Sequence, residues 1–232
     1  MVRSLISNPT NKMKTRLIFT TLALISALAV QAADGIRYQA QPAGNKVRIE
    51  GTSTAHDWEM EGTLIGGFVE FESAVQFDTA QATIPGLKDK KLAIKSLVIV
   101  PVRSVKSDAK AMAQVMDGLM QDALKEADFK KIECRISELT FKEPHAAGKP
   151  FEFDAAGELA IAGVTNKVTF PVTIDVVEKD KLKITGSAPV KMTAYGVKPP
   201  APSFGLGLMK CGDDVKVIFD WNIAKTATTA SK

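Results

Sequence analysis

The sequence predicts an all-β domain of antiparallel strands with one α-helix, preceded by a secretory signal peptide. Three observations lead to this prediction. Apolar and polar residues alternate with a period of two through most of the chain, which is typical of strands with one buried face. One central segment has helical spacing instead. The first 32 residues have the charge and hydropathy profile of an export signal.

The signal peptide is predicted from three features that follow one another. Basic residues between positions 12 and 16 precede an uncharged apolar run over 17–30, and the run ends in Val30-Gln31-Ala32. Small or β-branched residues at these positions suit cleavage after Ala32. The run is about 14 residues long, which favours a signal peptide over an uncleaved membrane anchor. We therefore expect residues 33–232 to form the mature, exported chain.

Removal of the signal peptide changes the charge of the protein. The whole chain has 30 Lys and Arg against 26 Asp and Glu, a net charge of +4. Four of the basic residues and none of the acidic ones lie in the first 32 positions, which leaves 26 of each sign. A nucleic-acid-binding domain keeps a basic excess on its folded part. The composition therefore excludes that class of partner.

The mature chain has the length of one domain and contains about eight alternating segments. A turn such as Glu178-Lys179-Asp180-Lys181 separates neighbouring segments. Many antiparallel strands with one helix indicate a β-barrel or a β-sandwich, and the alternation alone fits either. The predicted strands contain residues 46–50, 69–72, 92–100, 132–136, 151–153, 168–176, 182–192 and 215–221.

The predicted helix runs from Ser107 to about Ala127, with Ser107-Asp108 as its N-terminal cap. Its apolar residues recur at helical spacing: Met112, Val115, Met116, Leu119, Met120, Ala123 and Leu124. Met112, Met116 and Met120 lie at i, i+4 and i+8. Flexible thioethers suit a plastic surface against a variable apolar ligand, but an ordinary core role is the favoured interpretation.

Two cysteines, Cys134 and Cys211, remain in a compartment that permits disulfides. A bridge between them would close a long loop and stabilise the protein by about 4 kcal/mol in the chain-entropy picture. The alternative is two buried thiols packed as small hydrophobic groups. The spacing leaves both open, because it does not show whether the Cβ atoms meet.

The segment His56-Asp57-Trp58 is the most reactive-looking group of side chains. Catalysis would need a nucleophile or a metal with further ligands. The sequence has one other histidine, His145, and a zinc site needs three or four ligands. We therefore expect no catalytic residue, no metal and no cofactor. The favoured interpretation is that the N–H groups of His56 and Trp58 satisfy buried backbone at a strand junction.

Several motifs, taken in order, resemble the YceI-like family of bacterial exported proteins. They are Ser53 to Trp58 (STAHDW), Met116-Asp117, Ala123-Leu124, Gly157 to Val168 (GELAIAGVTNKV), Met192 to Pro200 (MTAYGVKPP) and Gly212 to Val215 (GDDV). The resemblance extends from about residue 36 to 223. It implies a lipocalin-like, extended eight-stranded antiparallel barrel whose apolar tunnel holds a long isoprenoid chain, such as a polyprenyl or quinone tail. Cys134 departs from the aromatic or aliphatic residue that the family pattern suggests.

The resemblance favours a cavity over a filled barrel, so inward-facing strand residues become predicted ligand contacts. The expected partner is an isoprenoid or similar amphiphile, with transient membrane contact. The basic residues Lys90, Lys91, Arg103 and Lys106 are interpreted as solvated, the alternative being contact with a phosphate head group. Two other functions stay open: a filled barrel that acts as an accessory protein, and an enzyme acting on such a lipid. The predicted ligand contacts are Trp58, Phe71, Ile94, Val98, Ile136, Phe153, Phe170, Val172 and Ile184.

Overall fold

The computed structural model describes residues 35–201 and 209–226, so the predicted signal peptide and its cleavage site lie outside the described residues. The described part contains one α-helix, α1 (Ala113–Ala123), and three short 3-10 turns, Val102–Ser104, Lys110–Met112 and Met192–Tyr195. Its strands are β1 (Ile36–Ala40), β2 (Lys46–Ser53), β3 (Trp58–Gly62), β4 (Gly66–Phe71), β5 (Lys91–Pro101), β6 (Lys106–Ser107), β7 (Lys131–Phe141), β8 (Phe151–Ile161), β9 (Val164–Glu178), β10 (Lys181–Lys191) and β11 (Cys211–Lys225).

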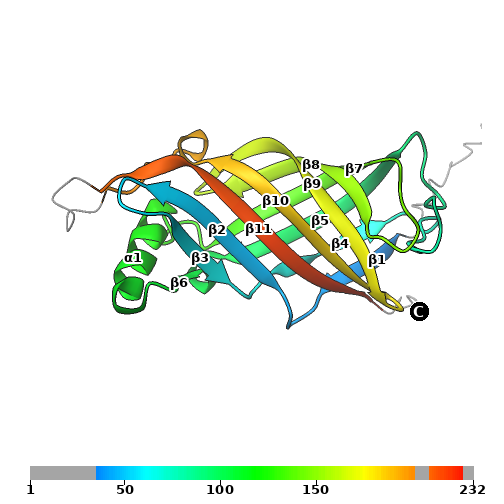
Figure 1. Ribbon diagram of the computed structural model, residues 1–232, viewed down its shortest axis with the longest axis horizontal. Coiled ribbons are helices and arrows are strands. Elements are labelled where there is room, and N and C mark those ends of the chain that lie inside the picture. The colour runs from blue at the N-terminus through cyan, green and yellow to red at the C-terminus, as the bar shows by residue number, and fades with distance from the viewer. Residues whose placement is uncertain (1–34, 202–208, 227–232) are drawn as a thin grey trace, which may run out of the picture. The chain divides into compact units, whose positions relative to one another are not determined.

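These strands close into a single antiparallel barrel of eight strands, as predicted (Figure 1). The ring runs β1-β4-β5-β7-β8-β9-β10-β11 and returns to β1, where Ala40 pairs with Ile223. Closure leaves no exposed sheet edge around the ring. It also decides between the barrel and the sandwich, which the alternation alone did not distinguish.

Three of the eight barrel strands are interrupted, which accounts for the three additional short strands. Both β1 and β2 run antiparallel to β11, so together they form one broken strand. In the same way β3 continues β4, because β3 pairs with β2 and β4 pairs with β1. Strand β6 pairs with β3 and β5 pairs with β4, so β6 continues β5 after a 3-10 turn.

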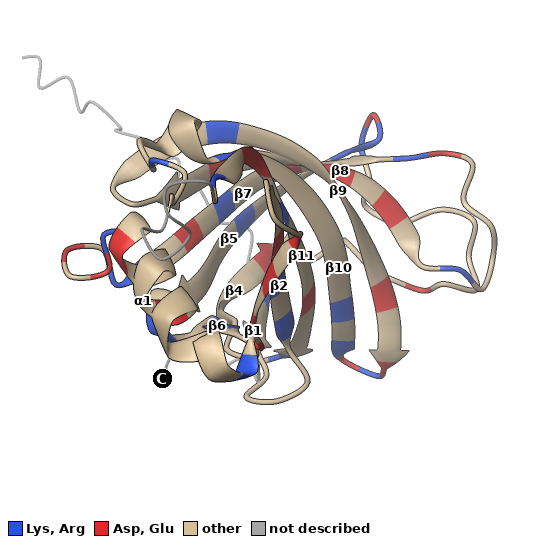
Figure 2. Cartoon of the chain, turned by 60° about the vertical axis from the view of Figure 1, so that its left-hand side comes forward, with Lys and Arg blue, Asp and Glu red and all other residues tan. Residues whose placement is uncertain are grey.

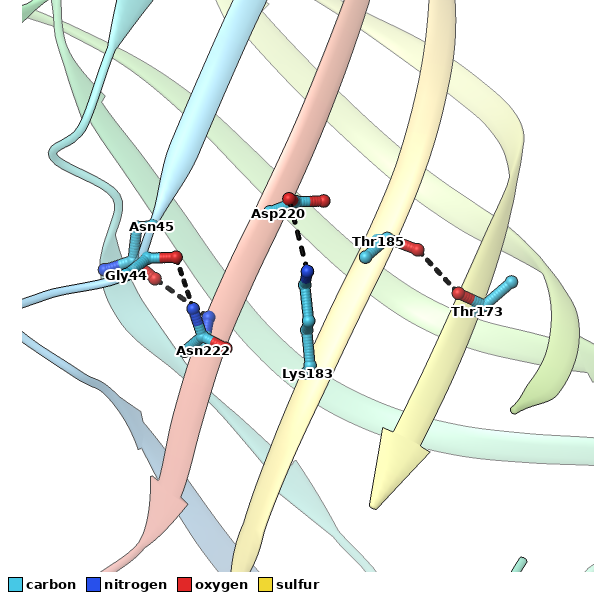
Figure 3. A network of polar contacts seen from close by, with 7 residues as sticks. All are labelled: Gly44, Asn45, Thr173, Lys183, Thr185, Asp220 and Asn222. Carbon is cyan, nitrogen blue, oxygen red and sulfur yellow. Dashed lines mark hydrogen bonds and ion pairs between the residues drawn. The ribbon is translucent and has the colours of Figure 1, made fainter. Parts of the chain in front are cut away.

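The break between β1 and β2 is held by side-chain amides (Figure 3) and by a backbone hydrogen bond from Gln41 N to Asn222 O at 2.8 Å. Asn45 is only 5% exposed; its Nδ2 donates to Gln41 O at 2.6 Å, and its Oδ1 accepts from Asn222 N at 2.8 Å. The Asn222 side chain in turn donates to Gly44 O at 2.5 Å. These bonds satisfy backbone groups that the break removes from the ladder, as buried polar groups require.

The helix is shorter than the sequence predicts, and the predicted cap is wrong. Ser107 belongs to β6, where it pairs with Met60, and its hydroxyl accepts a hydrogen bond from Ala109 N at 3.2 Å rather than from the first turn of α1. A 3-10 turn follows, with Lys110 at a φ of 42°, before α1 starts at Ala113. The helix ends at Ala123, and Lys125 has a φ of 53°, which is incompatible with further helix.

Inside the barrel, alternation places apolar side chains on the inner face and charged ones outside. Acidic and basic residues are interspersed along the strands (Figure 2). One example is Lys183 of β10, whose Nζ lies 3.3 Å from the Asp220 carboxylate of β11. On the inner side of the same two strands, Ile184 and Trp221 are buried partners.

Candidate ligand-binding cavity

The barrel encloses a cavity of about 1380 Å³. Side chains from every strand except β1 line it, together with α1, and most of them are apolar. Sites for drug-sized ligands typically measure about 300–1,000 Å³. The cavity therefore has room for a larger apolar molecule than such sites hold, and the barrel is not filled by its own side chains.

The residues predicted to face the interior nearly all line this cavity. Eight of the nine do so, drawn from six of the strands: Trp58, Phe71, Ile94, Val98, Ile136, Phe170, Val172 and Ile184. Their contact with a ligand stays a prediction. Phe153 is the exception, because it is fully buried among other aromatic rings beyond the end of the cavity.

Helix α1 lies across one end of the barrel (Figure 1) and presents its methionines to the cavity. Met112, Met116 and Met120 all line it, and Leu119 lies beside them. None of the residues of α1 is fully buried. Met120 also packs against the hydrophobic core, as the favoured core interpretation predicts, whereas Met112 is 39% exposed. Flexible thioethers at this position form an adaptable apolar surface.

Two carboxylates fasten α1 to the barrel. Asp117 accepts a hydrogen bond from Ser107 N at 2.8 Å and lies 3.1 Å from Lys106 Nζ. After the helix, Glu126 lies 2.9 Å from Arg103 Nε; its side chain is only 8% exposed. The Arg103 guanidinium holds the pKa of Glu126 below its usual range.

The four basic residues considered as a phosphate site are engaged elsewhere. Lys106 and Arg103 form the ion pairs that fasten α1. Lys90 pairs with Glu143 at 2.8 Å, and Lys91 pairs with Glu138 at 2.9 Å. None of the four lines the cavity. The geometry agrees with the interpretation of these residues as surface groups.

Trp58 stands at the mouth of the cavity, where its indole lies over Gly51. Its Nε1 donates to Thr52 O at 3.1 Å, which agrees with the predicted backbone-satisfying role. A Cβ on Gly51 would lie 2.2 Å from the indole, so only glycine permits this close approach. His56 is exposed, and its Nδ1 lies 2.7 Å from the adjacent Asp57 O. His56 therefore does not satisfy buried backbone, which was the role predicted for it.

The second histidine lies away from the first. His145 stacks on Phe151, with ring centroids 4.3 Å apart, and it does not line the cavity. Within residues 35–201 and 209–226, no group of three or more His, Cys, Asp or Glu side chains could hold a metal ion. The arrangement of these side chains therefore gives no support to a metal site in the described part.

Cys134 and Cys211 are both free thiols, so the bridge considered as one alternative is not formed. Both line the cavity, Cys134 on β7 and Cys211 at the start of β11. These strands lie four places apart in a ring of eight, and thus on opposite walls. Burial raises the pKa of the Cys134 thiol to about 12 and also raises the pKa of Cys211. A thiol with such a pKa is almost entirely protonated at neutral pH and is a poor nucleophile.

Some lining residues lie outside the predicted set. Trp221 and Tyr195 line the cavity, and Trp221 continues the alternating series of β11 that starts at Val215. Leu139 is a further lining residue. It lies beyond a bulge at Ser137 in β7, which exchanges the inward and outward positions of the strand. Alternation could have found Trp221, but nothing local in the sequence marks the bulge.

The profile of the YceI-like domain matches residues 38–223. The chain belongs to the YceI-like family. The match covers the whole barrel apart from a few residues at either end of it. Comparison with curated proteins gives no significant match.

Two solved structures share this fold. A polyisoprenoid-binding domain from Saccharophagus degradans, implicated in plant cell wall breakdown, has a TM-score of 0.57 and 12% identity, and the match covers 82% of this chain and 99% of that one. BcnA of Burkholderia cenocepacia has a TM-score of 0.53 and 18% identity, with 77% and 95% covered. At these identities the likeness shows the fold of this YceI-like chain and nothing finer.

None of the helices in the described part of the chain has the length and apolar character needed to cross a membrane.

Proposed function

We propose that this protein is a periplasmic binding protein that sequesters or carries a long-chain isoprenoid lipid of the polyprenyl or quinone type. The observation that carries the proposal is the cavity of about 1380 Å³ with its predominantly apolar wall. Each methylene group moved from water into such a wall contributes about 0.8 kcal/mol. A chain of tens of carbons would bind tightly through burial alone.

The cellular location belongs to the same proposal. Export through a signal peptide at residues 1–32 would place the domain of residues 33–232 between two membranes. A water-insoluble chain crossing that space needs shielding from water. The polyisoprenoid-binding domain of similar fold supports the choice of ligand class.

Binding is favoured over catalysis because the cavity lacks an activated nucleophile among its described residues. The best candidate, Cys134, has a pKa raised to about 12. Ser96 also lines the cavity, but its hydroxyl is bonded to both the N–H and the carbonyl of Ile136, at 2.7 and 3.0 Å. Neither group has the neighbouring base that nucleophilic catalysis requires.

The proposal is tested by native mass spectrometry of the protein purified from its own host, followed by solvent extraction. We expect a co-purifying species with the mass of a long prenyl chain. A matched pair of variants locates it: Val98→Trp adds bulk to the cavity, and Ile99→Trp adds the same bulk to the outer face of β5. Val98→Trp should reduce the bound lipid while Ile99→Trp retains it. A clean apo mass together with no uptake of apolar probes would overturn the proposal.

A further inference from the structure

One end of the cavity is closed by a layer of aromatic rings. Phe141, Phe151 and Phe153 are all less than 4% exposed, and the centroid of Phe141 lies 6.2 Å from that of Phe151 and 5.4 Å from that of Phe153. None of the three lines the cavity. They therefore fill the barrel beyond its far end, opposite the end that α1 covers.

A further ring of this layer comes from outside the barrel wall. Phe77 belongs to the connection between β4 and β5, which lies at the end of the barrel away from α1 (Figure 1). Its centroid lies 5.9 Å from that of Phe151 and 6.5 Å from that of Phe153. Val75 and Ile84 of the same connection are both 4% exposed. The connection thus packs into the barrel end rather than passing over it.

Phe71 marks the boundary between the cavity and this layer. It lines the cavity, is 1% exposed, and meets Phe77 edge to face with centroids 5.0 Å apart. Tyr38 contacts it on another side, at 5.8 Å. Phe77 itself does not line the cavity. An apolar chain that reaches this end of the cavity would therefore contact Phe71, together with Ile174 of β9, which pairs with Phe151 and also lines the cavity.

We infer that Phe71, backed by Phe77, is a specificity-determining stop that sets the longest isoprenoid chain the cavity fully buries. This inference rests on the proposed function and adds a selectivity to it. A chain shorter than the cavity leaves part of the cavity wall without ligand contact, so each added methylene is buried there and strengthens binding about fourfold. Once the tail reaches Phe71, further units stay in water at the mouth. Affinity then stops rising, and a plot of affinity against chain length has a break.

The position of the break should move with the stop. Phe71→Leu removes ring atoms from the blind end, and Phe77→Ala removes the ring behind Phe71, so both should move the break to longer chains. Ala155 lines the cavity on β8, two residues from Phe153, so Ala155→Leu should move the break to shorter chains. Two matched controls make the same changes on the outer face of the barrel: Phe68→Leu, at a ring that Arg37 covers at 3.5 Å, and Ala156→Leu. Both controls should leave the position of the break unchanged.

The experiment uses a series of all-trans polyprenols that differ by one isoprene unit. Binding is followed by the fluorescence of Trp58 and Trp221, the two tryptophans of the chain, since both line the cavity. An isoprene unit adds five carbons, so we expect affinity to rise by about two to three orders of magnitude per unit up to the break and then to level off. Phe77→Ala keeps the test decisive if Phe71→Leu does not fold.

The two hypotheses fail in different ways. Saturable binding whose break is unmoved by Phe71→Leu, Phe77→Ala and Ala155→Leu overturns the stop but leaves the proposed function intact. The absence of saturable binding by the unmodified protein at every chain length overturns the proposed function, and the stop with it.

Discussion

We expect the Cys134 thiol to react with alkylating reagents about a thousandfold more slowly in the folded protein than in the unfolded chain. Burial raises its pKa from 9.0 to about 12. At about pH 8 the reactive thiolate fraction therefore falls from roughly one tenth to roughly one in ten thousand. The measurement is the rate of iodoacetamide labelling of a Cys211→Ser variant, followed by mass spectrometry with and without concentrated urea.

The same pKa shift predicts a dependence of stability on pH. Because the folded pKa is the higher one, the contribution of the protonated thiol is fully present below pH 9.0 and is lost as the pH rises toward 12. At about pH 10.5 the loss should reach about 2 kcal/mol. Cys134→Ala removes this loss, so urea unfolding of the two proteins should converge as the pH rises. A native labelling rate within tenfold of the unfolded rate, or a pH-independent stability difference, would refute the reasoning.

Three further substitutions test the fold around the cavity. Asn45→Ala leaves the backbone N–H of Asn222 without its acceptor and should lower the free energy of unfolding by about 2–4 kcal/mol; an unchanged urea midpoint would contradict this. Gly51→Ala places a Cβ 2.2 Å from the Trp58 indole, so the ring must turn away. We expect a shift of the tryptophan emission maximum and, because the indole hydrogen bond is lost, a decrease of about 1 kcal/mol in the free energy of unfolding. An unaltered spectrum would show that the mouth accommodates the methyl group. Glu126→Gln removes a carboxylate whose pKa is lowered in the folded protein, so it removes a stabilisation that is present above pH 4.5 and lost as the pH falls. The variant should therefore be less stable than the unmodified protein at neutral pH. Thermal unfolding that follows the same pH profile in both proteins would argue against the ion pair.

The alternation of the strands predicted most of the wall because a strand keeps the same residues on its inner face wherever no bulge interrupts it. Phe170 and Val172 on β9 follow this rule without interruption, and both line the cavity. Phe153 follows it too, yet lies outside the cavity because Phe77, from a distant connection, packs against it. The depth of a residue along a barrel depends on such long-range contacts, and alternation carries no information about them.

The helix shows a second limit of sequence patterns. Its apolar spacing correctly indicated a helix with one apolar face, but the spacing is the same whether that face meets packed core or empty space. Met116 and Met120 adjoin the cavity because the barrel beneath them is hollow. The start of the helix was misplaced for a related reason: Ser107 has the character of a cap but pairs with Met60 of another strand.

The pairing of β1 with β11 has a kinetic consequence. It joins Ala40 to Ile223, close to the largest separation in sequence that the described chain allows. Contacts of this kind form late, because the whole intervening chain must first be ordered. Until the last strand docks, the curved sheet is an open trough whose apolar inner face is accessible along its length. A long hydrocarbon laid into that trough would be enclosed by the final step of folding, without passing the mouth beside α1.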